Sequence, residues 1–146
     1  MSLNRREVVT YGTGVMALVA LPTSLWAASD KSQAAIAEFT GGADVGSGGL
    51  ALEAPEIAEN GNTVPIGVSV DVSGDVYPEA VMILADGNPS PGVATFMFTP
   101  NSGEAVASTR IRLAKTQDVI AVAKMSDGSF IMDQKTVKVT IGGCGG

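Results

Sequence analysis

Every second residue from Val64 to Val72 is a branched apolar residue. The positions between them are small or polar: Pro65, Gly67, Ser69 and Asp71. Because successive side chains of a β-strand point to opposite sides, this alternation predicts a strand with one buried and one wetter face. Tyr77–Ala85 is apolar almost throughout, which is typical of a central strand.

Further segments with strand periodicity follow one another between turn-forming residues. The segments are Leu50–Leu52, Val93–Thr99, Ala105–Leu113, Val119–Met125, Phe130–Met132 and Val137–Ile141. The turns are Asn60-Gly61-Asn62, Asp86–Gly92, Pro100–Gly103 and Ser126-Asp127-Gly128. About seven or eight short strands joined in this way predict an all-β, immunoglobulin-like antiparallel sandwich.

One segment before the strands has helical spacing instead. Between Asp30 and Phe39, apolar residues stand at Ala34, Ile36 (or Ala35) and Phe39, so we expect a short helix. Gly41-Gly42 would end it, since glycine adopts the left-handed conformation of a helix C-cap. Few aromatic residues follow, so the core would consist mainly of Val, Ile, Leu and Ala, and a partner covering one sheet would stabilise it.

The first 27 residues have the layout of an export signal. Arg5 and Arg6 precede an apolar stretch from Val8 to Leu21, and small residues follow at Ala27-Ala28. Paired arginines are typical of twin-arginine translocation, so we expect delivery to the periplasm. An uncleaved membrane anchor is the alternative, although the stretch is shorter than the roughly 20 residues of a spanning helix. The expected domains are therefore a signal (1–27), a sandwich (28–141) and a C-terminal arm (142–146).

Composition excludes several classes of function. The chain carries a net charge of −6 and no basic cluster, which argues against binding to nucleic acid or an anionic membrane surface. It contains no histidine, which excludes histidine-dependent catalytic triads and removes the commonest metal ligand. Its single cysteine can form neither an internal disulfide nor a zinc site. We expect no metal and no resident cofactor.

That cysteine, Cys144, lies in the sequence Gly142-Gly143-Cys144-Gly145-Gly146, directly after the last predicted strand. Glycine has the largest conformational entropy to lose, so we expect a flexible, slender arm that reaches roughly 10 Å beyond Ile141. Such an arm would place a thiol in a partner's narrow active-site channel. The neighbouring sequence offers no group to activate the thiol, which predicts a passive covalent attachment point rather than a catalytic residue.

Other candidate residues are weaker. Glu53, Glu56 and Glu59 surround a turn, but their spacing does not match a calcium loop, and we expect solvated carboxylates. Arg110 and Arg112 share a strand face that would meet an anionic partner or adduct, or would simply be a polar surface. The glycines at 46, 48 and 49 do not open a helix after a strand, so no phosphate-binding loop is expected.

The arm and several other segments resemble the SoxY family, the sulfur-carrier subunits of the thiosulfate-oxidising (Sox) multienzyme system. The terminal Gly-Gly-Cys-Gly-Gly after Val137–Ile141 is similar to that family, as are Ala54–Pro65, Arg110–Ala114 and Ser126–Gly128. The resemblance covers about residues 30 to 146. It implies that Cys144 is the attachment site and that Gly142, Gly143, Gly145 and Gly146 form the carrier arm.

The resemblance also implies partners. An immunoglobulin-like subunit of this family pairs with a second β-sandwich protein, SoxZ. A haem-containing enzyme joins thiosulfate oxidatively to the cysteine, a hydrolase releases sulfate, and a further enzyme oxidises or transfers the remaining sulfane sulfur. The chain itself would be a carrier on which these enzymes act.

Two other functions remain open from the sequence. Small ubiquitin-like sulfur carriers also end in Gly-Gly, and they carry sulfur as a terminal thiocarboxylate. Alternatively, an exported sandwich could use its cysteine only for an intermolecular disulfide.

Overall fold

The computed structural model describes residues 28–144, which form one α-helix, one short 3-10 helix and two β-sheets. The expected export signal and the last two glycines of the arm, Gly145 and Gly146, lie outside these residues. No helix within the described range is long and apolar enough to cross a membrane.

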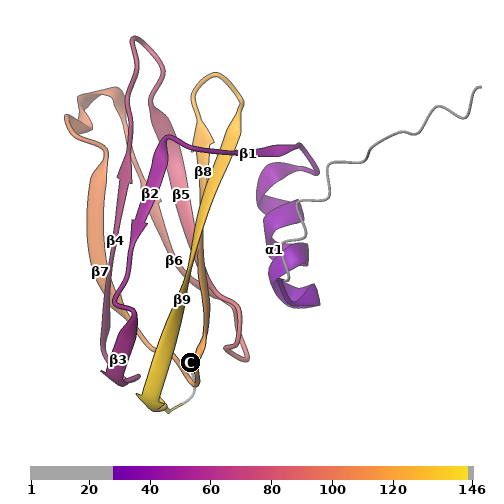
Figure 1. Cartoon of the computed structure of the whole chain (residues 1–146). Coiled ribbons are helices and arrows are strands. Elements are labelled where there is room, and N and C mark those ends of the chain that lie inside the picture. The colour runs from indigo at the N-terminus through magenta and orange to yellow at the C-terminus, as the bar shows by residue number, and fades with distance from the viewer. Residues whose placement is uncertain (1–27, 145–146) are drawn as a thin grey trace, which may run out of the picture.

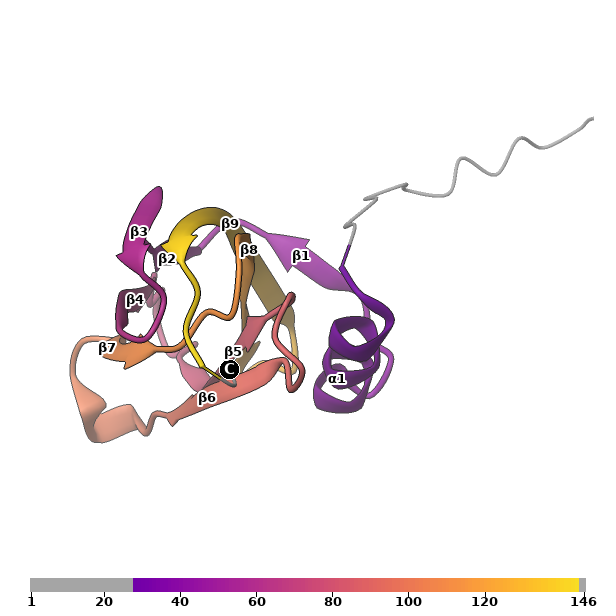
Figure 2. The same cartoon turned by 90° about the horizontal axis from the view of Figure 1, so that it is seen from below.

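The helix α1 (Asp30–Thr40) occupies the predicted position and has both caps. The Ser29 hydroxyl accepts a hydrogen bond from the amide of Ser32 at its start, and Gly41 adopts the left-handed conformation (φ 64°) at its end. The partly buried Ala35, Ile36 and Phe39 pack on the outer face of the larger sheet. Figures 1 and 2 both show α1 beside that face, away from the smaller sheet.

The larger sheet has six strands. Four of them follow the order β9 (Phe130–Ile141), β8 (Gln117–Met125), β5 (Pro78–Ala85) and β6 (Gly92–Met97), and each is antiparallel to the next in this order. The free side of β9 is shared by two short strands, which both pair with it in parallel. These are β1 (Val45–Ser47) at its start and β3 (Ile57–Asn60) at its end.

The smaller sheet has three antiparallel strands in the order β2 (Leu50–Glu53), β4 (Val64–Val70) and β7 (Val106–Ile111). In β4, Val64, Ile66, Val68 and Val70 are buried between the sheets, as their alternation predicts. The short 3-10 helix η1 (Pro100–Ser102) lies on the connection from β6 to β7. The predicted immunoglobulin-like sandwich is thus confirmed, and its fully buried side chains are chiefly Val, Leu and Ile.

The strands differ from the expectations in two details. Phe130–Met132 and Val137–Ile141 belong to one long strand, β9, and β1 and β3 had no predicted counterpart. Pairing with β9 defines these two short strands, since β1 has no buried residue and β3 has one. The predicted Asn60-Gly61-Asn62 turn is present and joins β3 in the larger sheet to β4 in the smaller one, so it forms a corner between the two sheets.

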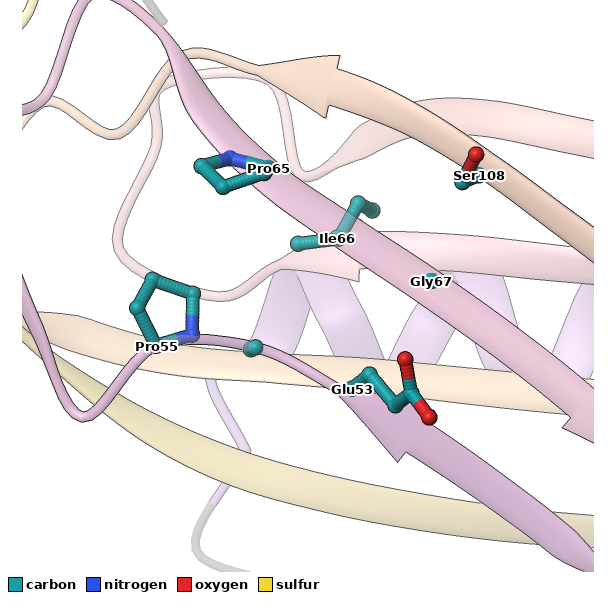
Figure 3. Close-up of a pocket in the computed structure, with 7 residues that line it drawn as sticks. Glu53, Pro55, Pro65, Ile66, Gly67 and Ser108 are labelled. Atoms are coloured by element: carbon teal, nitrogen blue, oxygen red, sulfur yellow. The ribbon is translucent and has the colours of Figure 1, made fainter.

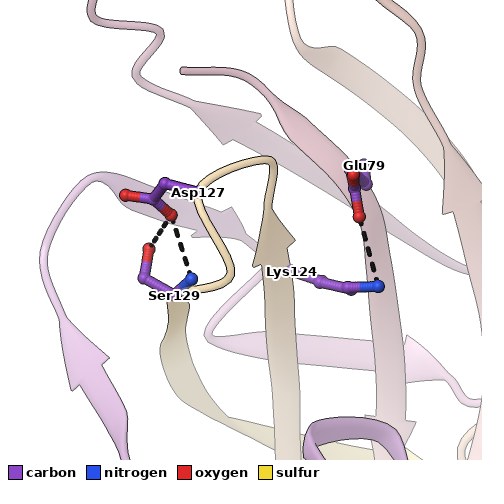
Figure 4. A network of polar contacts seen from close by, with 4 residues as sticks. All are labelled: Glu79, Lys124, Asp127 and Ser129. Carbon is purple, nitrogen blue, oxygen red and sulfur yellow. Dashed lines mark hydrogen bonds and ion pairs between the residues drawn. The ribbon is translucent and has the colours of Figure 1, made fainter.

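The opposite end of the sandwich is closed by the predicted turn between β8 and β9. There the Asp127 carboxylate accepts hydrogen bonds from the Ser129 amide at 2.9 Å and from the Ser129 hydroxyl at 2.6 Å. Figure 4 shows this turn next to an ion pair of 3.2 Å between Lys124 on β8 and Glu79 on β5. These contacts lie far along β8 and β9 from Cys144, so they shape the scaffold and not the cysteine end.

Candidate functional site

Cys144 is exposed and follows the C-terminal end of β9. At that end β3 runs beside β9 (Figure 1), and the Asn60-Gly61-Asn62 turn follows β3. The amide of Gly61 donates a 2.7 Å hydrogen bond to the carbonyl oxygen of Ile141, the last residue of β9. The Asn60-Gly61-Asn62 turn therefore lies directly against the point where the tail begins.

The described part of the tail, residues 142–144, is bound to the body of the domain. The Gly143 amide donates to the carbonyl oxygen of Leu113 at 2.8 Å, and the Cys144 amide donates to the Asn62 side-chain oxygen at 3.1 Å. We expected a free arm from Gly142 onward, and for Gly142 and Gly143 that expectation is wrong. The tail runs between the Asn60–Asn62 turn and the loop after β7, and both segments supply hydrogen-bond acceptors.

Leu113 connects this loop to the core. Its side chain is fully buried, while its amide donates to the Gly61 carbonyl oxygen at 2.8 Å and its carbonyl accepts from Gly143. One core residue thus fixes both the turn and the tail. We call Gly61, Asn62 and Leu113 the tail cradle.

The glycines in the tail and the turn are required by close packing. A Cβ atom at Gly143 would lie 2.6 Å from the Gly61 carbonyl oxygen, and one at Gly61 would lie 2.7 Å from the Gly143 nitrogen. A Cβ atom at Gly142 would collide with the Ala114 carbonyl oxygen. None of these three glycines has a positive φ, so space and not backbone conformation demands glycine. The sequence alone had indicated flexibility as the reason for Gly142 and Gly143.

A buried pair of amide side chains supports the loop after β7. The Asn88 side chain donates to the Arg112 carbonyl at 2.8 Å and accepts from the Ala114 amide at 3.0 Å. It also accepts from the Gln117 side chain at 2.9 Å, and Gln117 in turn accepts from the Gly87 amide at 2.8 Å. Both side chains are buried, and together they hold the backbone on each side of Leu113. Sequence reasoning missed this pair because the two residues lie 29 positions apart.

The prediction that Arg110 and Arg112 share a strand face is wrong for Arg112, because β7 ends at Ile111, although both side chains are exposed. Arg110 lies on β7 opposite Pro65, and Arg112 is exposed in the loop that contacts the tail, next to Leu113. Lys115 lies in the same loop, where its side chain packs against Gly87. The fold therefore brings the Arg112 loop against the tail, a proximity that the sequence did not indicate.

Metal binding finds no support in residues 28–144, where no group of three or more acidic, cysteine or histidine side chains lies together. Glu53, Glu56 and Glu59 are exposed, as expected for solvated carboxylates.

An open hollow of about 380 Å³ lies on the smaller sheet, and its lining shares no residue with the tail cradle. Its lining is Glu53, Ala54, Pro55, Pro65, Ile66, Gly67 and Ser108 (Figure 3). Glu53 is the sole ionisable side chain in this lining, and no cysteine or cation faces it. The hollow therefore offers little chemistry compared with the tail.

Comparisons with known proteins agree with this arrangement. The family model described as sulfur oxidation protein SoxY matches residues 36–144. The structure of the sulfur carrier protein SoxY from Chlorobium limicola f thiosulfatophilum is 33% identical, with a TM-score of 0.65 over 75% of this chain and 91% of that chain. No match was found among curated proteins.

More distant structures share the fold alone. A superoxide reductase (neelaredoxin) from Ignicoccus hospitalis has a TM-score of 0.56 at 18% identity, over 64% of this chain and 81% of that chain. The superoxide reductase from Nanoarchaeum equitans has a TM-score of 0.52 at 14% identity, over 64% and 99%. The SoxY comparison goes further than these, because the family model matches residues 36–144, which include Cys144, and the solved SoxY structure is 33% identical over 75% of this chain. The chain therefore belongs to the SoxY family of sulfur oxidation proteins.

Proposed function

We propose that this protein carries thiosulfate-derived sulfur covalently on Cys144 during thiosulfate oxidation. The observation that carries the proposal is the position of the single cysteine of the chain, exposed on a glycine tail just beyond the last strand of a SoxY-family sandwich. An exposed thiol on a narrow tail is accessible to more than one enzyme in turn. Within the described residues, the tail is held by backbone groups and one amide side chain, a setting that supports a carrier rather than a catalyst.

Sulfur would be loaded onto Cys144 and removed from it in three steps. In loading, the Cys144 sulfur forms a bond to the sulfane sulfur of thiosulfate, with loss of the thiol proton and transfer of two electrons to a haem-containing partner enzyme. In hydrolysis, water cleaves the bond between the sulfane sulfur and the sulfonate, which releases sulfate and leaves a persulfide on Cys144. A third enzyme then oxidises or transfers the remaining sulfane sulfur.

A second β-sandwich subunit of the SoxZ kind would form a heterodimer with this chain. Exposed apolar side chains on two edge strands support such a pairing. Met97 on β6 is 75% exposed and Val106 on β7 is 57% exposed, and a partner sheet or loop would remove both from water.

The proposed location is the periplasm, reached by twin-arginine translocation. The support comes from Arg5 and Arg6 ahead of an apolar stretch and from small residues near Ala27.

A reconstituted thiosulfate-oxidising assay with the partner enzymes tests the carrier role. Cys144→Ser keeps the size of the side chain and lies at an exposed position, so it should fold and bind its partner normally but support no turnover. Ser129→Ala, at an exposed turn far from the tail, is a control that should retain turnover. A Cys144→Ser protein that still supports thiosulfate-dependent turnover would refute the proposal.

A further inference from the structure

The docked tail restricts where the Cys144 thiol can go. The tail is bound through the amides of Gly143 and Cys144, so the backbone of the cysteine is itself held on the domain. Three residues beyond Ile141 extend about 10 Å only when they are fully stretched. A thiol that enters a partner's channel therefore requires a tail from which both hydrogen bonds have been broken.

The two bonds differ in kind. The Gly143 bond joins backbone to backbone and ends on Leu113, which is anchored in the core. The Cys144 bond ends on the side chain of Asn62, which is exposed and lies 82 positions earlier in the chain. The backbone amide of Asn62 donates a 3.0 Å hydrogen bond to the side-chain oxygen of Asn60, which shapes the turn and orients Asn62. The Asn62 side chain thus binds the backbone of Cys144, and it can be replaced without disturbing the core.

We propose that Asn62 is a positioning residue that holds Cys144 in a docked state and sets the fraction of molecules whose tail is free. The inference rests on the proposed carrier function. A partner enzyme that accepts only an extended tail binds only the molecules whose tail is free. Its apparent dissociation constant for the carrier is therefore the intrinsic constant divided by the free fraction. Docking would thereby keep the tail on the domain until a partner engages it.

Removal of the Asn62 bond should shift this equilibrium measurably. A hydrogen bond at an exposed site changes an equilibrium roughly twofold to tenfold. In Asn62→Ala, the free fraction should rise by that factor. The substitution should be tolerated because Asn62 is exposed and does not have a positive φ.

Hydrogen exchange of the Cys144 and Gly143 amides, followed by NMR in the purified chain, tests docking directly. We expect the Cys144 amide to exchange about twofold to tenfold faster in Asn62→Ala than in the wild type. Asn62→Asp retains the acceptor oxygen and should exchange at close to the wild-type rate. Asn101→Ala, at an exposed position in η1, is the matched control and should change nothing. Equal exchange rates in the wild type and in Asn62→Ala would overturn the inference.

Steady-state kinetics with the loading enzyme separate positioning from a general structural effect. Asn62→Ala should lower the KM for the carrier by the same factor and leave kcat unchanged, because only the binding-competent fraction changes. An unchanged KM, or a fall in kcat alone, would contradict the inference. If the loading enzyme attaches no sulfur to the wild-type chain, the proposed carrier function is refuted. The hydrogen-exchange experiment still decides whether Asn62 docks the tail.

Discussion

Leu113 donates its backbone amide to the carbonyl oxygen of Gly61 at 2.8 Å, although 52 positions separate the two residues. The carbonyl of the same leucine accepts the amide of Gly143. Since the Leu113 side chain is fully buried, the core of the sandwich determines where the tail leaves the domain. The carrier tail of this protein is thus an extension of the packed domain as far as Gly143.

Gly61→Ala should destabilise the domain because the new methyl group has no room. It would collide with the Leu113 carbonyl oxygen and lie 3.0 Å from a Val139 methyl carbon. Overpacking of this kind costs about 1–3 kcal/mol of unfolding free energy, which urea denaturation measures. Gly92→Ala is the matched control, since a Cβ atom there has open space and φ is not positive, and its effect should stay within about 1 kcal/mol. Equal stability of the two variants would show that the close approach at Gly61 is absent in solution.

Asn88→Ala should weaken the loop that holds the tail. The substitution removes three hydrogen bonds and leaves the Gln117 side chain without its buried partner. The expected loss of unfolding free energy is on the order of 2–3 kcal/mol. Asn101→Ala at the exposed η1 should cost less than about 0.5 kcal/mol. A loss for Asn88→Ala no larger than that of this control would mean that the amide pair does not support the loop.

The helix α1 should be held less firmly in acid because of Asp86. Its carboxylate accepts the Ser29 amide at 2.7 Å. Burial opposes ionisation of this carboxyl, but hydrogen bonds from Ser29 and Ser32 and the nearby charge of Lys115 outweigh burial and hold its pKa below 3.8. Because the pKa of Asp86 is lower in the folded chain than in the unfolded chain, ionised Asp86 stabilises the fold at pH values above the unfolded-state pKa. This contribution disappears as the pH falls from 3.8 through the folded-state pKa.

Asp86→Asn reveals this contribution. The difference in unfolding free energy between the wild type and Asp86→Asn should be constant above about pH 5 and should shrink as the pH falls below 4. Denaturation followed by circular dichroism at a series of pH values gives the difference directly. A difference that stays the same down to pH 2 would show that ionised Asp86 does not contribute to the attachment of α1.

The export hypothesis depends on the arginine pair. Replacement of both Arg5 and Arg6 by lysine preserves the charge but removes the guanidinium groups, so the precursor should accumulate in the cytoplasm. Cell fractionation followed by immunoblotting measures the distribution. Lysine at Arg110 and Arg112 is the control and should leave delivery unchanged. Normal periplasmic delivery of the first double variant would point to another export route.

Local sequence patterns predicted most of the fold. The helix with its Gly41 cap and the alternating strand β4 follow from residues that are neighbours in the chain. The short strands β1 and β3 did not emerge, because each pairs with a segment of β9 more than 80 positions away and little of their own surface is buried. Such pairing leaves no periodicity in the short strand itself.

The same reasoning applies to the site. A single cysteine among glycines identified Cys144 from the sequence, because composition alone makes that residue unusual. The docking of Gly142 and Gly143 was missed, since a glycine required by a close backbone approach is identical in sequence to a glycine that provides flexibility. Only the positions of Gly61 and Leu113 in the folded chain distinguish the two cases.

Mass spectrometry of the protein isolated from cells oxidising thiosulfate tests the central claim most directly. Trypsin cleaves after Lys138 and releases the peptide that begins at Val139 and contains Cys144. The account predicts that a fraction of this peptide carries thiosulfate-derived sulfur on the Cys144 side chain, as a thiosulfonate or a persulfide, and that a reductant removes it. Sulfur found only on the Gly146 carboxylate, or a disulfide-linked peptide without any added sulfur, would contradict the account.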